Sequence, residues 1–413
     1  MHFSDFGRRF AGYSGITHLM DDLNEGLLQE HVVMMGGGNP AAIPAVIKTF
    51  EKVIDDLQAS GQLIKALANY DGPQGNDAFI ESLAGFFQHQ YGWKIDRRNI
   101  ALTHGSQSSF FTLFNSFAGK SKNKHQKILI PLVPEYIGYS DVGIEESMIV
   151  SQEAKIQRLE DGLFKYQVDF ERLEVEPNTG LICVSRPTNP SGNVLSDTEC
   201  QQLDRIALKN DVPLLVDNAY GTPFPGIIFN QVEPFWNENT IVCMSLSKLG
   251  LPGARTGIVI ANEEIIRLFS NMTAIGSLAP GGIGPVIMRR LIEDKLLLPL
   301  CHEVIMPFYQ KQSQRAIQLL RDSIDDDRLH IHKTEGALFL WLWFEDLGIS
   351  TSELYRRLKQ KGLLVVPGKY FFPGQQEPTQ HAESCIRLNY VQSDQDLKKG
   401  VEILARELKS CWA

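Results

Sequence analysis

The chain lacks the features of several large classes of protein. Its 413 residues contain no block of like charge and carry a formal net charge of −9, whereas nucleic-acid binding needs a basic surface. No apolar stretch has the length of a membrane-spanning helix, and Asp5 lies where a secretory signal would be apolar. We therefore expect a cytoplasmic protein whose partners include neither nucleic acid nor membrane.

Other motifs are also missing. The six cysteines are scattered without a CxxC, which fits a reducing compartment rather than a disulfide framework. No GxxxxGK[ST] occurs, and the pair at 302–303 begins an HExxH zinc motif that lacks its second histidine. The run 36–41 matches GxGxxA, but the acids about 20 residues on, Asp55 and Asp56, fall within a predicted helix. We therefore expect neither a dinucleotide site nor a metal site.

What is present is the pattern of an α/β protein. Helical spacing occurs at 15–30 and at about 44–57, ahead of a series of short apolar runs. Continuous apolar runs are typical of strands buried on both faces, so they predict a mainly parallel sheet covered by helices. Ligands bind outside the carboxyl ends of such strands. The runs lie at 100–103, 127–133, 181–185, 213–217, 240–244 and 256–261.

The segment after residue 300 has a different pattern, which predicts a smaller α+β domain. We divide the chain into an N-terminal arm with a segment that packs against the small domain (1–48), a large ligand-binding domain (49–300) and a small C-terminal domain (301–413). Helices are predicted at about 304–323, 351–361 and 394–409, with strand-like runs at 337–344, 362–366 and 385–390.

A lysine follows one of the predicted strands in an unusual setting. Lys248 comes shortly after the run 240–244, with hydroxyls at Ser245 and Ser247. Arg255 follows seven residues later. A desolvated lysine is a good Schiff-base nucleophile, and the hydroxyls and the guanidinium suit a phosphate. The combination predicts a lysine bonded to a phosphorylated aldehyde, which is pyridoxal phosphate.

An acid and a tyrosine fit the same cofactor. Asp217 ends the run 213–217, where a buried acid needs a cationic partner such as a pyridinium nitrogen. Tyr220, three residues on, is placed to contact the cofactor's phenolic oxygen. Taken alone, Asp217 is more simply a helix N-cap or a loop acid, and it is Lys248 that favours the functional interpretation.

Two more segments follow predicted strands. Gly105, Ser106 and Gln107 precede a helical run at 108–117, and the free N–H groups at such a helix start suit a phosphate. A plain N-cap is the alternative. Tyr136 follows the run 127–133 and is placed to stack on a pyridine ring, although core packing is the simpler explanation.

Three further residues are candidates for ligand binding, one of them across a subunit interface. Asn189 lies in a rigid turn with two prolines, which holds its amide in place or is merely structural. Arg387 lies within a strand-like run, where it either faces outward or holds a substrate carboxylate. Tyr70, in the loop 70–75, is placed to reach a phosphate across a dimer interface.

In this order along the chain, the motifs resemble the fold-type I pyridoxal-phosphate aminotransferases over essentially the whole sequence. The resemblance implies a homodimer in which Lys248 forms the Schiff base and moves the proton at the substrate Cα. It implies that Asp217 pairs with the ring nitrogen and that Tyr136 stacks on the ring, while Tyr220 and Asn189 contact the phenolic oxygen. The residues implied to bind the phosphate are Gly105, Ser106, Gln107, Ser245, Ser247, Arg255 and the partner subunit's Tyr70; those implied to bind the substrate carboxylate are Gly38, Asn189 and Arg387.

A second set of motifs indicates the reaction. The segments 69–75, 134–139, 217–221, 223–226 and 277–285 resemble members of this family that exchange amino groups between valine and pyruvate, giving 3-methyl-2-oxobutanoate and alanine. An aminotransferase for another aliphatic amino acid and a fold-type I C–S lyase share every cofactor residue, so both stay open. A transcriptional regulator on this fold is disfavoured, because about 30 residues before the turn at 36–40 are too few for a DNA-binding domain.

Overall fold

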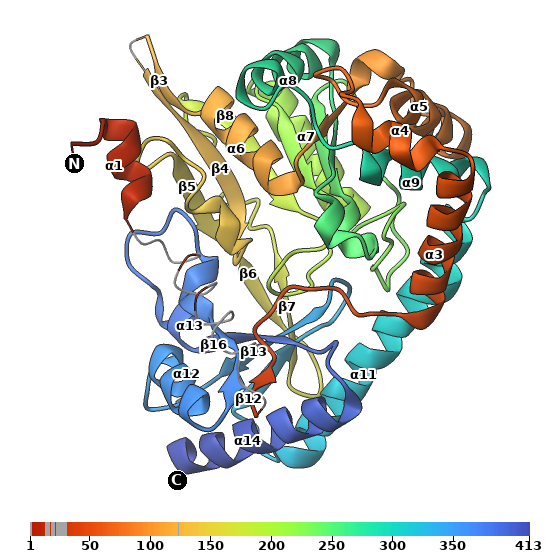
Figure 1. Cartoon of the computed structure of the whole chain (residues 1–413). Helices are drawn as coiled ribbons and strands as arrows, with labels where there is room; N and C mark the ends of the chain where they lie inside the picture. The colour runs from red at the N-terminus through yellow and green to blue at the C-terminus, as the bar shows by residue number, and fades with distance from the viewer. Residues whose placement is uncertain (1, 13–16, 18–20, 22–30, 123) are drawn as a thin grey trace.

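The structure is a computed structural model that describes residues 2–12, 17, 21, 31–122 and 124–413. Most of the helix predicted at 15–30 lies outside the described residues. The described chain forms an α/β layer around an eight-stranded sheet and, below it in Figure 1, a second layer around a six-stranded sheet. The long helix α11 (Met306–Ser323) runs beside the second sheet.

The eight-stranded sheet is parallel at its centre, as predicted. Its order is β2-β11-β10-β9-β8-β4-β3, with β5 beside β4. The pairs β10–β9, β9–β8, β8–β4 and β4–β5 are parallel, whereas β11 runs antiparallel to both its neighbours and β3 runs antiparallel to β4. The strands are β2 (Ile100–Thr103), β3 (Gly119–Ser121), β4 (Lys124–Val133), β5 (Ile149–Glu153), β8 (Thr179–Ser185), β9 (Leu214–Asp217), β10 (Thr240–Ser245) and β11 (Gly257–Ile260).

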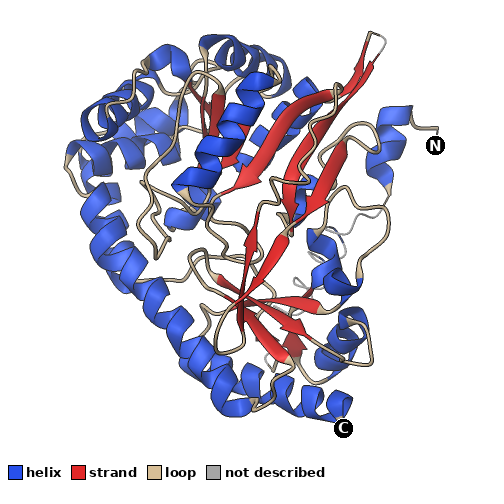
Figure 2. Ribbon diagram, turned by 180° about the vertical axis from the view of Figure 1, so that it is seen from behind, coloured by secondary structure: helices blue, strands red, loops and turns tan. Residues whose placement is uncertain are grey.

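Helices cover both faces of this sheet (Figure 2), which explains the continuous apolar runs. Along β10, Val242 and Met244 pack in a core shared with α5 and α9. Ile241 and Cys243 point to the other face and pack in a core shared with α6, α7 and α8. The helices of this layer are α3 (Pro44–Ala59), α4 (Gln62–Ala68), α5 (Asp77–Tyr91), α6 (Ser106–Phe117), α7 (Asp197–Lys209), α8 (Glu263–Gly276) and α9 (Ile283–Glu293).

The six-stranded sheet has the order β15-β16-β13-β12-β7-β6. Two of its strands, β6 (Lys155–Arg158) and β7 (Leu163–Gln167), come from within 49–300, while the other four follow residue 300. Near the N-terminus, β1 (Val33–Met34) pairs with β14 (Leu363–Leu364). The remaining elements are β12 (Leu329–His332), β13 (Phe339–Phe344), β15 (Val366–Pro367), β16 (Cys385–Asn389), α1 (Asp5–Ala11), α10 (Leu297–Pro299), α12 (Thr351–Gln360), α13 (Gln380–Glu383), α14 (Asp394–Trp412), the π-helical η5 (Leu300–Ile305), and the 3₁₀ turns η1 (Arg97–Asn99), η2 (Ile137–Tyr139), η3 (Leu246–Leu249), η4 (Pro252–Ala254) and η6 (Gly368–Phe371).

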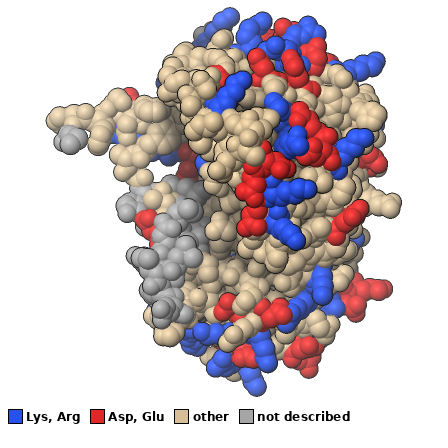
Figure 3. Space-filling view, turned by 45° about the vertical axis from the view of Figure 1, so that its right-hand side comes forward, with Lys and Arg blue, Asp and Glu red and all other residues tan. Residues whose placement is uncertain are grey.

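The surface carries charges of both signs. On the face shown in Figure 3, lysine and arginine side chains are intermixed with aspartate and glutamate. No helix within the described residues is both long and apolar enough to cross a membrane. The described residues also hold no cluster of three or more His, Cys, Asp or Glu side chains suited to a metal ion.

Candidate active site

A cavity of about 220 Å³ lies at the carboxyl ends of the central strands. Every predicted site residue except Gly105 and Tyr70 lines it, so residues that are more than 300 positions apart in the sequence meet at one place. The predicted residues that line the cavity are Gly38, Ser106, Gln107, Tyr136, Asn189, Asp217, Tyr220, Ser245, Ser247, Lys248, Arg255 and Arg387.

Lys248 lies in η3, directly after β10. Its Nζ donates a hydrogen bond to the Gly38 carbonyl oxygen at 2.5 Å and lies 5.4 Å from the centre of the Tyr220 ring. Burial, together with the charges of Arg387 and Arg255, lowers the pKa of the amine from 10.5 to about 8. A sizeable fraction of this amine is therefore neutral near pH 8, as a nucleophile or a proton acceptor must be.

One end of the cavity is suited to an anion. Ser106 opens α6, so free backbone N–H groups and the positive end of the helix lie there. The preceding Gly105 has φ of 89°, and a Cβ on it would lie only 2.4 Å from Arg255 Nη2. Gly105 does not line the cavity, but because it has no side chain, the Arg255 guanidinium can approach the start of α6. The hydroxyls of Ser245 and Ser247, 3.0 Å apart, complete this end.

Asp217 lies at the end of β9 and is held by two donors. Its Oδ2 accepts from the Tyr139 hydroxyl at 2.9 Å, and its Oδ1 accepts from the Ala219 N–H at 3.0 Å. Burial raises the pKa of Asp217 to about 6, although the Tyr139 hydrogen bond and the charge of Lys248 oppose this rise. Because that value is below 7, the carboxyl is mainly an anion at neutral pH, and it is not the N-cap of a helix.

Arg387 marks the opposite end of the cavity, and the alternative that it faces outward is wrong. Its side chain is buried on β16 between the rings of Phe339 and Phe371, at 4.2 and 5.0 Å from their centres. Nη1 donates to Asn189 Oδ1 at 2.8 Å and Nη2 donates to the Gly36 carbonyl oxygen at 2.7 Å. The buried Nε has no hydrogen-bond partner among the described residues. Burial lowers the pKa of Arg387 to about 10, which leaves the guanidinium charged at neutral pH.

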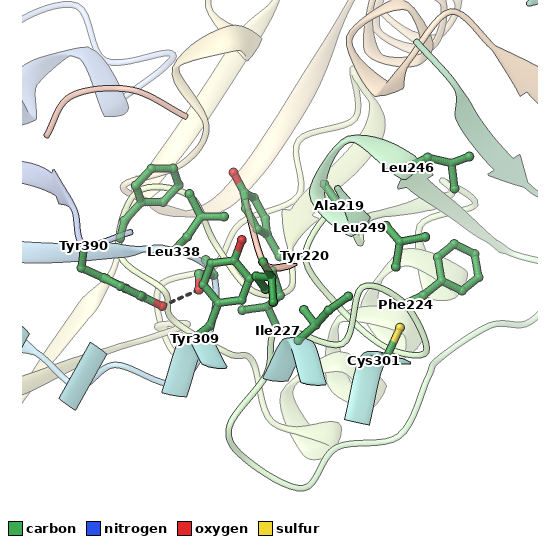
Figure 4. Packing of buried hydrophobic residues seen from close by; sticks show 14 of the residues in the cluster. Ala219, Tyr220, Phe224, Ile227, Leu246, Leu249, Cys301, Tyr309, Leu338 and Tyr390 are labelled. Atoms are coloured by element: carbon green, nitrogen blue, oxygen red, sulfur yellow. Dashed lines mark hydrogen bonds between the residues drawn. The ribbon is translucent and has the colours of Figure 1, made fainter. Parts of the chain in front are cut away.

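Two aromatic side chains form further walls. The Tyr136 ring packs edge-on against Tyr139, 5.4 Å between centres, and a Cβ at Gly138 would lie 2.3 Å from its Cε1. Tyr220 belongs to an apolar cluster with Phe224, Leu246 and Tyr309. Figure 4 shows Tyr220 at the edge of that cluster, with its hydroxyl directed away from the apolar side chains.

The two apolar layers meet beneath Tyr220. Tyr390, at the end of β16, donates its hydroxyl to the Ala337 carbonyl oxygen at 2.7 Å, the bond drawn in Figure 4. Ala219, Ile227 and Leu338 pack in the same cluster. The cluster therefore joins residues of the two layers beneath the cavity.

Sequence reasoning missed several residues at the site. Asn389 donates to the Gly37 carbonyl oxygen at 2.7 Å and so helps to hold the glycine turn. Tyr139 and Glu135 belong to the same motif as Tyr136, but no role was predicted for them. An acid and a second tyrosine directly after a buried strand need hydrogen-bond partners, and this requirement could have identified both residues. Ser185, which bonds to both, gives no signal in the sequence.

Comparison with known proteins identifies the class. The model of the family "Aminotransferase class I and II" matches residues 16–404. The chain therefore belongs to the class I and II aminotransferases, and it acts on small amino and oxo acids.

Within that family, the chain is similar over its whole length to particular members. It is 52% identical to the valine–pyruvate aminotransferase of Escherichia coli (strain K12), over 100% of this chain and 99% of that protein. A solved structure of a valine–pyruvate aminotransferase from Salmonella typhimurium LT2 has 52% identity and a TM-score of 0.90, covering 96% of this chain and 99% of that one. A putative amino-acid aminotransferase from Psychrobacter arcticum 273-4 has 46% identity and a TM-score of 0.98, covering 100% and 99%. These structures confirm the predicted fold class.

Proposed function

We propose that the chain is a pyridoxal-phosphate enzyme that transfers the amino group of L-valine to pyruvate, giving 3-methyl-2-oxobutanoate and L-alanine. The observation that carries this proposal is the single cavity that holds a low-pKa lysine, a buried anion, an anion site at a helix start and a buried arginine. The similarity to two valine–pyruvate aminotransferases supports the choice of substrates.

The residues present fit pyridoxal phosphate. Ser106, Arg255 and the hydroxyls beside Lys248 suit its phosphate, and Asp217 suits its ring nitrogen. The buried Oε1 atom of Gln107 has no partner within the part of the chain that the structure describes, while its Nε2 donates to the Gly138 carbonyl oxygen at 3.0 Å. Because a phosphate also accepts hydrogen bonds, this acceptor does not contribute to the anion site. The fit to a phosphate rests on the start of α6, where Gly105 leaves room for the Arg255 guanidinium beside the free N–H groups of the helix.

When bound, pyridoxal phosphate supplies an aldehyde that carries the amino group and a cationic ring that accepts electrons from the substrate Cα. Asp217, as an anion, holds a proton at the ring nitrogen. The Tyr220 hydroxyl, which is directed away from the apolar cluster, would donate a hydrogen bond to the phenolic oxygen of the cofactor. Lys248, as a neutral amine, would take the proton from the substrate Cα and deliver it to the aldehyde carbon of the cofactor.

The substrate end of the cavity favours an apolar amino acid with one carboxylate. Three cations line the described cavity, and two of them, Lys248 and Arg255, lie at the cofactor end, which leaves Arg387 for the substrate. Phe110, Ile137 and Pro187 add apolar walls. Since one methylene changes binding by only about 1–3 kcal/mol, we expect loose selectivity among aliphatic amino acids.

We also propose a homodimer in which the partner subunit's Tyr70 completes the phosphate site. Tyr70 is 85% exposed and does not line the cavity of its own chain. An aromatic side chain so exposed is unusual on a monomer and is common at interfaces.

The substrate proposal is tested by mixing the purified protein with pyridoxal phosphate, L-valine and pyruvate and measuring alanine. Good turnover of another amino acid with no alanine from valine would reject the substrate pair and keep the family. Ammonia released from a β-substituted amino acid, without an oxo-acid acceptor, would instead indicate a C–S lyase.

The role of Lys248 is tested by borohydride reduction in the presence of pyridoxal phosphate, followed by peptide mapping. We expect the pyridoxyl group on Lys248. The matched control is Lys52→Met, which removes an exposed lysine of α3 and is expected to leave the labelled peptide unchanged. A pyridoxyl group on any other residue would overturn the assignment.

A further inference from the structure

A second carboxyl group, Glu135, lies behind Asp217 in a buried chain of four oxygens. Glu135 Oε2 is 2.5 Å from Ser185 Oγ, which is 3.1 Å from the Tyr139 hydroxyl oxygen. That oxygen is 2.9 Å from Asp217 Oδ2. Glu135 and Tyr139 are fully buried, and Ser185 and Asp217 are 2% and 7% exposed. The two carboxyl groups are thus joined by two hydroxyls, away from bulk water.

The number of hydrogen atoms in this chain fixes its charge. Three oxygen–oxygen contacts within hydrogen-bond distance need three hydrogens, and the Ser185 and Tyr139 hydroxyls supply two. If both carboxyl groups were ionised, one hydroxyl would donate to each of them, and the contact between the hydroxyls would hold no hydrogen. A third hydrogen, on one of the two carboxyl groups, satisfies every contact. The pair therefore carries one negative charge rather than two.

We propose that Glu135 holds this third hydrogen as a neutral carboxylic acid, and that it is a positioning residue which orients Tyr139 toward Asp217. Glu135 Oε2 then donates to Ser185 Oγ, Ser185 donates to the Tyr139 oxygen, and Tyr139 donates to Asp217. The charge state rests on the geometry alone, whereas its use at a ring nitrogen rests on the proposed function.

The surroundings decide which end holds the hydrogen. Among the described residues no lysine or arginine pairs with Glu135, whereas the charge of Lys248 favours the ionised form of Asp217. Burial and the charge of Asp217 together raise the pKa of Glu135 to about 8, against hydrogen bonds from Ser185. The other titratable groups that face Glu135 are Tyr139 on η2 and Cys183 on β8, and both are neutral because burial raises their pKa values.

The bonds that Glu135 accepts are compatible with a neutral acid. Oε1 accepts from the Ser185 N–H at 2.8 Å, as a carbonyl oxygen does. Oε2 accepts from the Tyr136 N–H at 3.2 Å, and a hydroxyl oxygen can accept this bond while donating its own hydrogen. The backbone N–H of Glu135 donates to the Phe371 carbonyl oxygen at 2.7 Å. The two backbone N–H donors therefore hold the carboxyl group in place, and the bond to Phe371 holds its backbone.

Glutamine is the matched substitution for a neutral glutamic acid. In Glu135→Gln, the amide nitrogen donates to Ser185 Oγ and the amide oxygen accepts from the Ser185 N–H. Only the bond from the Tyr136 N–H is lost. The control is Glu407→Gln, which replaces a buried glutamate that forms ion pairs with Lys361 and Arg357.

Infrared spectroscopy of the full chain at pH 7, with and without pyridoxal phosphate, tests the charge state. We expect the C=O stretch of a buried, protonated carboxyl group in the wild-type protein. This band should be absent in Glu135→Gln and present in Glu407→Gln. A band that remains in Glu135→Gln, or a wild-type protein without one, would overturn the proposal.

A second variant covers the case in which Glu135→Gln does not fold. Ser185→Ala removes the acceptor of the Glu135 hydrogen, so the C=O band should shift in frequency; an unshifted band contradicts the proposal.

The positioning role is tested by the affinity for pyridoxal phosphate across pH 6–7, a range below the pKa of about 8 of Glu135. Tyr139→Phe removes a hydrogen bond to a charged group and should weaken binding about tenfold or more. Glu135→Gln should change the affinity by less than about twofold and leave its pH dependence unaltered, whereas an altered pH dependence would show that Glu135 is ionised. If the infrared band is present and no transamination is measured, the charge state stands and the proposed function fails.

Discussion

At the residue scale, the site is built around charged groups that burial disfavours and that neighbours partly stabilise. Lys248 has a lowered pKa and Asp217 a raised one, and each favours the charged form of the other. Arg387 loses hydration but gains two aromatic faces and two oxygen acceptors. Groups shifted in this way cluster at catalytic sites because neutral amines and stable anions are needed there at neutral pH.

The lowered pKa of Lys248 predicts a pH-dependent stability. Between about 8 and its ordinary value of 10.5, the unfolded chain binds a proton at this lysine that the folded chain does not, so stability rises with pH in that window. Below pH 8 this lysine is protonated in both the folded and the unfolded chain, so its effect on the free energy of unfolding no longer changes with pH. Lys248→Met should therefore remove part of the rise in the thermal midpoint of the cofactor-free protein between pH 8 and 10.

The matched control is Lys52→Met on the exposed face of α3, which should leave the slope unchanged. Equal slopes for the wild-type and Lys248→Met proteins would show that the amine is not desolvated in the cofactor-free state.

Arg387 gives a second prediction at this scale. The guanidinium is planar, fits between the rings of Phe339 and Phe371, and offers two parallel donors to a carboxylate. Lysine has neither property, and loss of a hydrogen bond to a charged group costs about 1.5–3 kcal/mol. We expect Arg387→Lys to raise KM for valine and for pyruvate about tenfold or more, with a smaller change in kcat. Arg98→Lys, at an exposed pair with Asp96, should leave both constants unchanged; a fall confined to kcat would assign Arg387 another role.

At the scale of elements, the start of α6 brings the cofactor-binding groups together. The helix supplies N–H groups through Ser106, and Gly105 leaves room for the guanidinium of Arg255. In Gly105→Ala, a side chain would be forced into a left-handed conformation and against Arg255 Nη2. We expect the affinity for pyridoxal phosphate, measured by absorbance titration, to fall about tenfold or more.

Gly85→Ala is the control, since Gly85 lies within α5 and a Cβ there meets nothing within 4 Å. This change should leave cofactor affinity unaltered and stabilise the helix by up to about 1 kcal/mol. Equal affinities in the two variants would mean that the phosphate does not bind at the start of α6.

The strands that carry the site could be predicted because each is a continuous apolar run that ends at a polar residue. Asp217 and Lys248 both follow such runs, and the parallel sheet places their ends together. The strands β6 and β7 could not be assigned to the second sheet. Both are short and partly exposed, and β7 pairs with β12, more than 160 residues away. Pairing over such a separation is decided by tertiary packing and not by local pattern.

The hydrogen-bonded series of side chains from Glu135 to Asp217 could not be predicted from the sequence either. Tyr139, Ser185 and Asp217 lie on three separate elements, and Glu135 lies in the loop between β4 and η2. The role of the two hydroxyls follows only from the distances between these residues. In the sequence, Ser185 is one small residue at the end of an apolar run. The position of a proton follows from counting donors and acceptors in a buried space, which requires coordinates.

At the scale of the whole molecule, exposed apolar side chains gather near Tyr70. Leu67 on α4 is 58% exposed, and Ile275 and Leu278 at the end of α8 are 88% and 63% exposed. These segments are neighbours, since α4 contacts α9, which follows α8, and a Cβ at Gly282 would lie 3.0 Å from the Ala66 carbonyl oxygen. Exposed apolar side chains on neighbouring segments are typical of an interface between subunits.

If Tyr70 acts across that interface, two defective proteins should restore each other. In a hybrid dimer of Tyr70→Ala and Lys248→Ala subunits, one site has Lys248 from the first subunit and Tyr70 from the second, so it is intact. Random assortment places such a site at about a quarter of all positions. We therefore expect co-refolding of the two variants in equal amounts to give about a quarter of the wild-type activity, measured as alanine formed from valine and pyruvate. If Tyr70 serves its own subunit instead, every site in the hybrid lacks one group, and the mixture cannot exceed the activity of its Tyr70→Ala component.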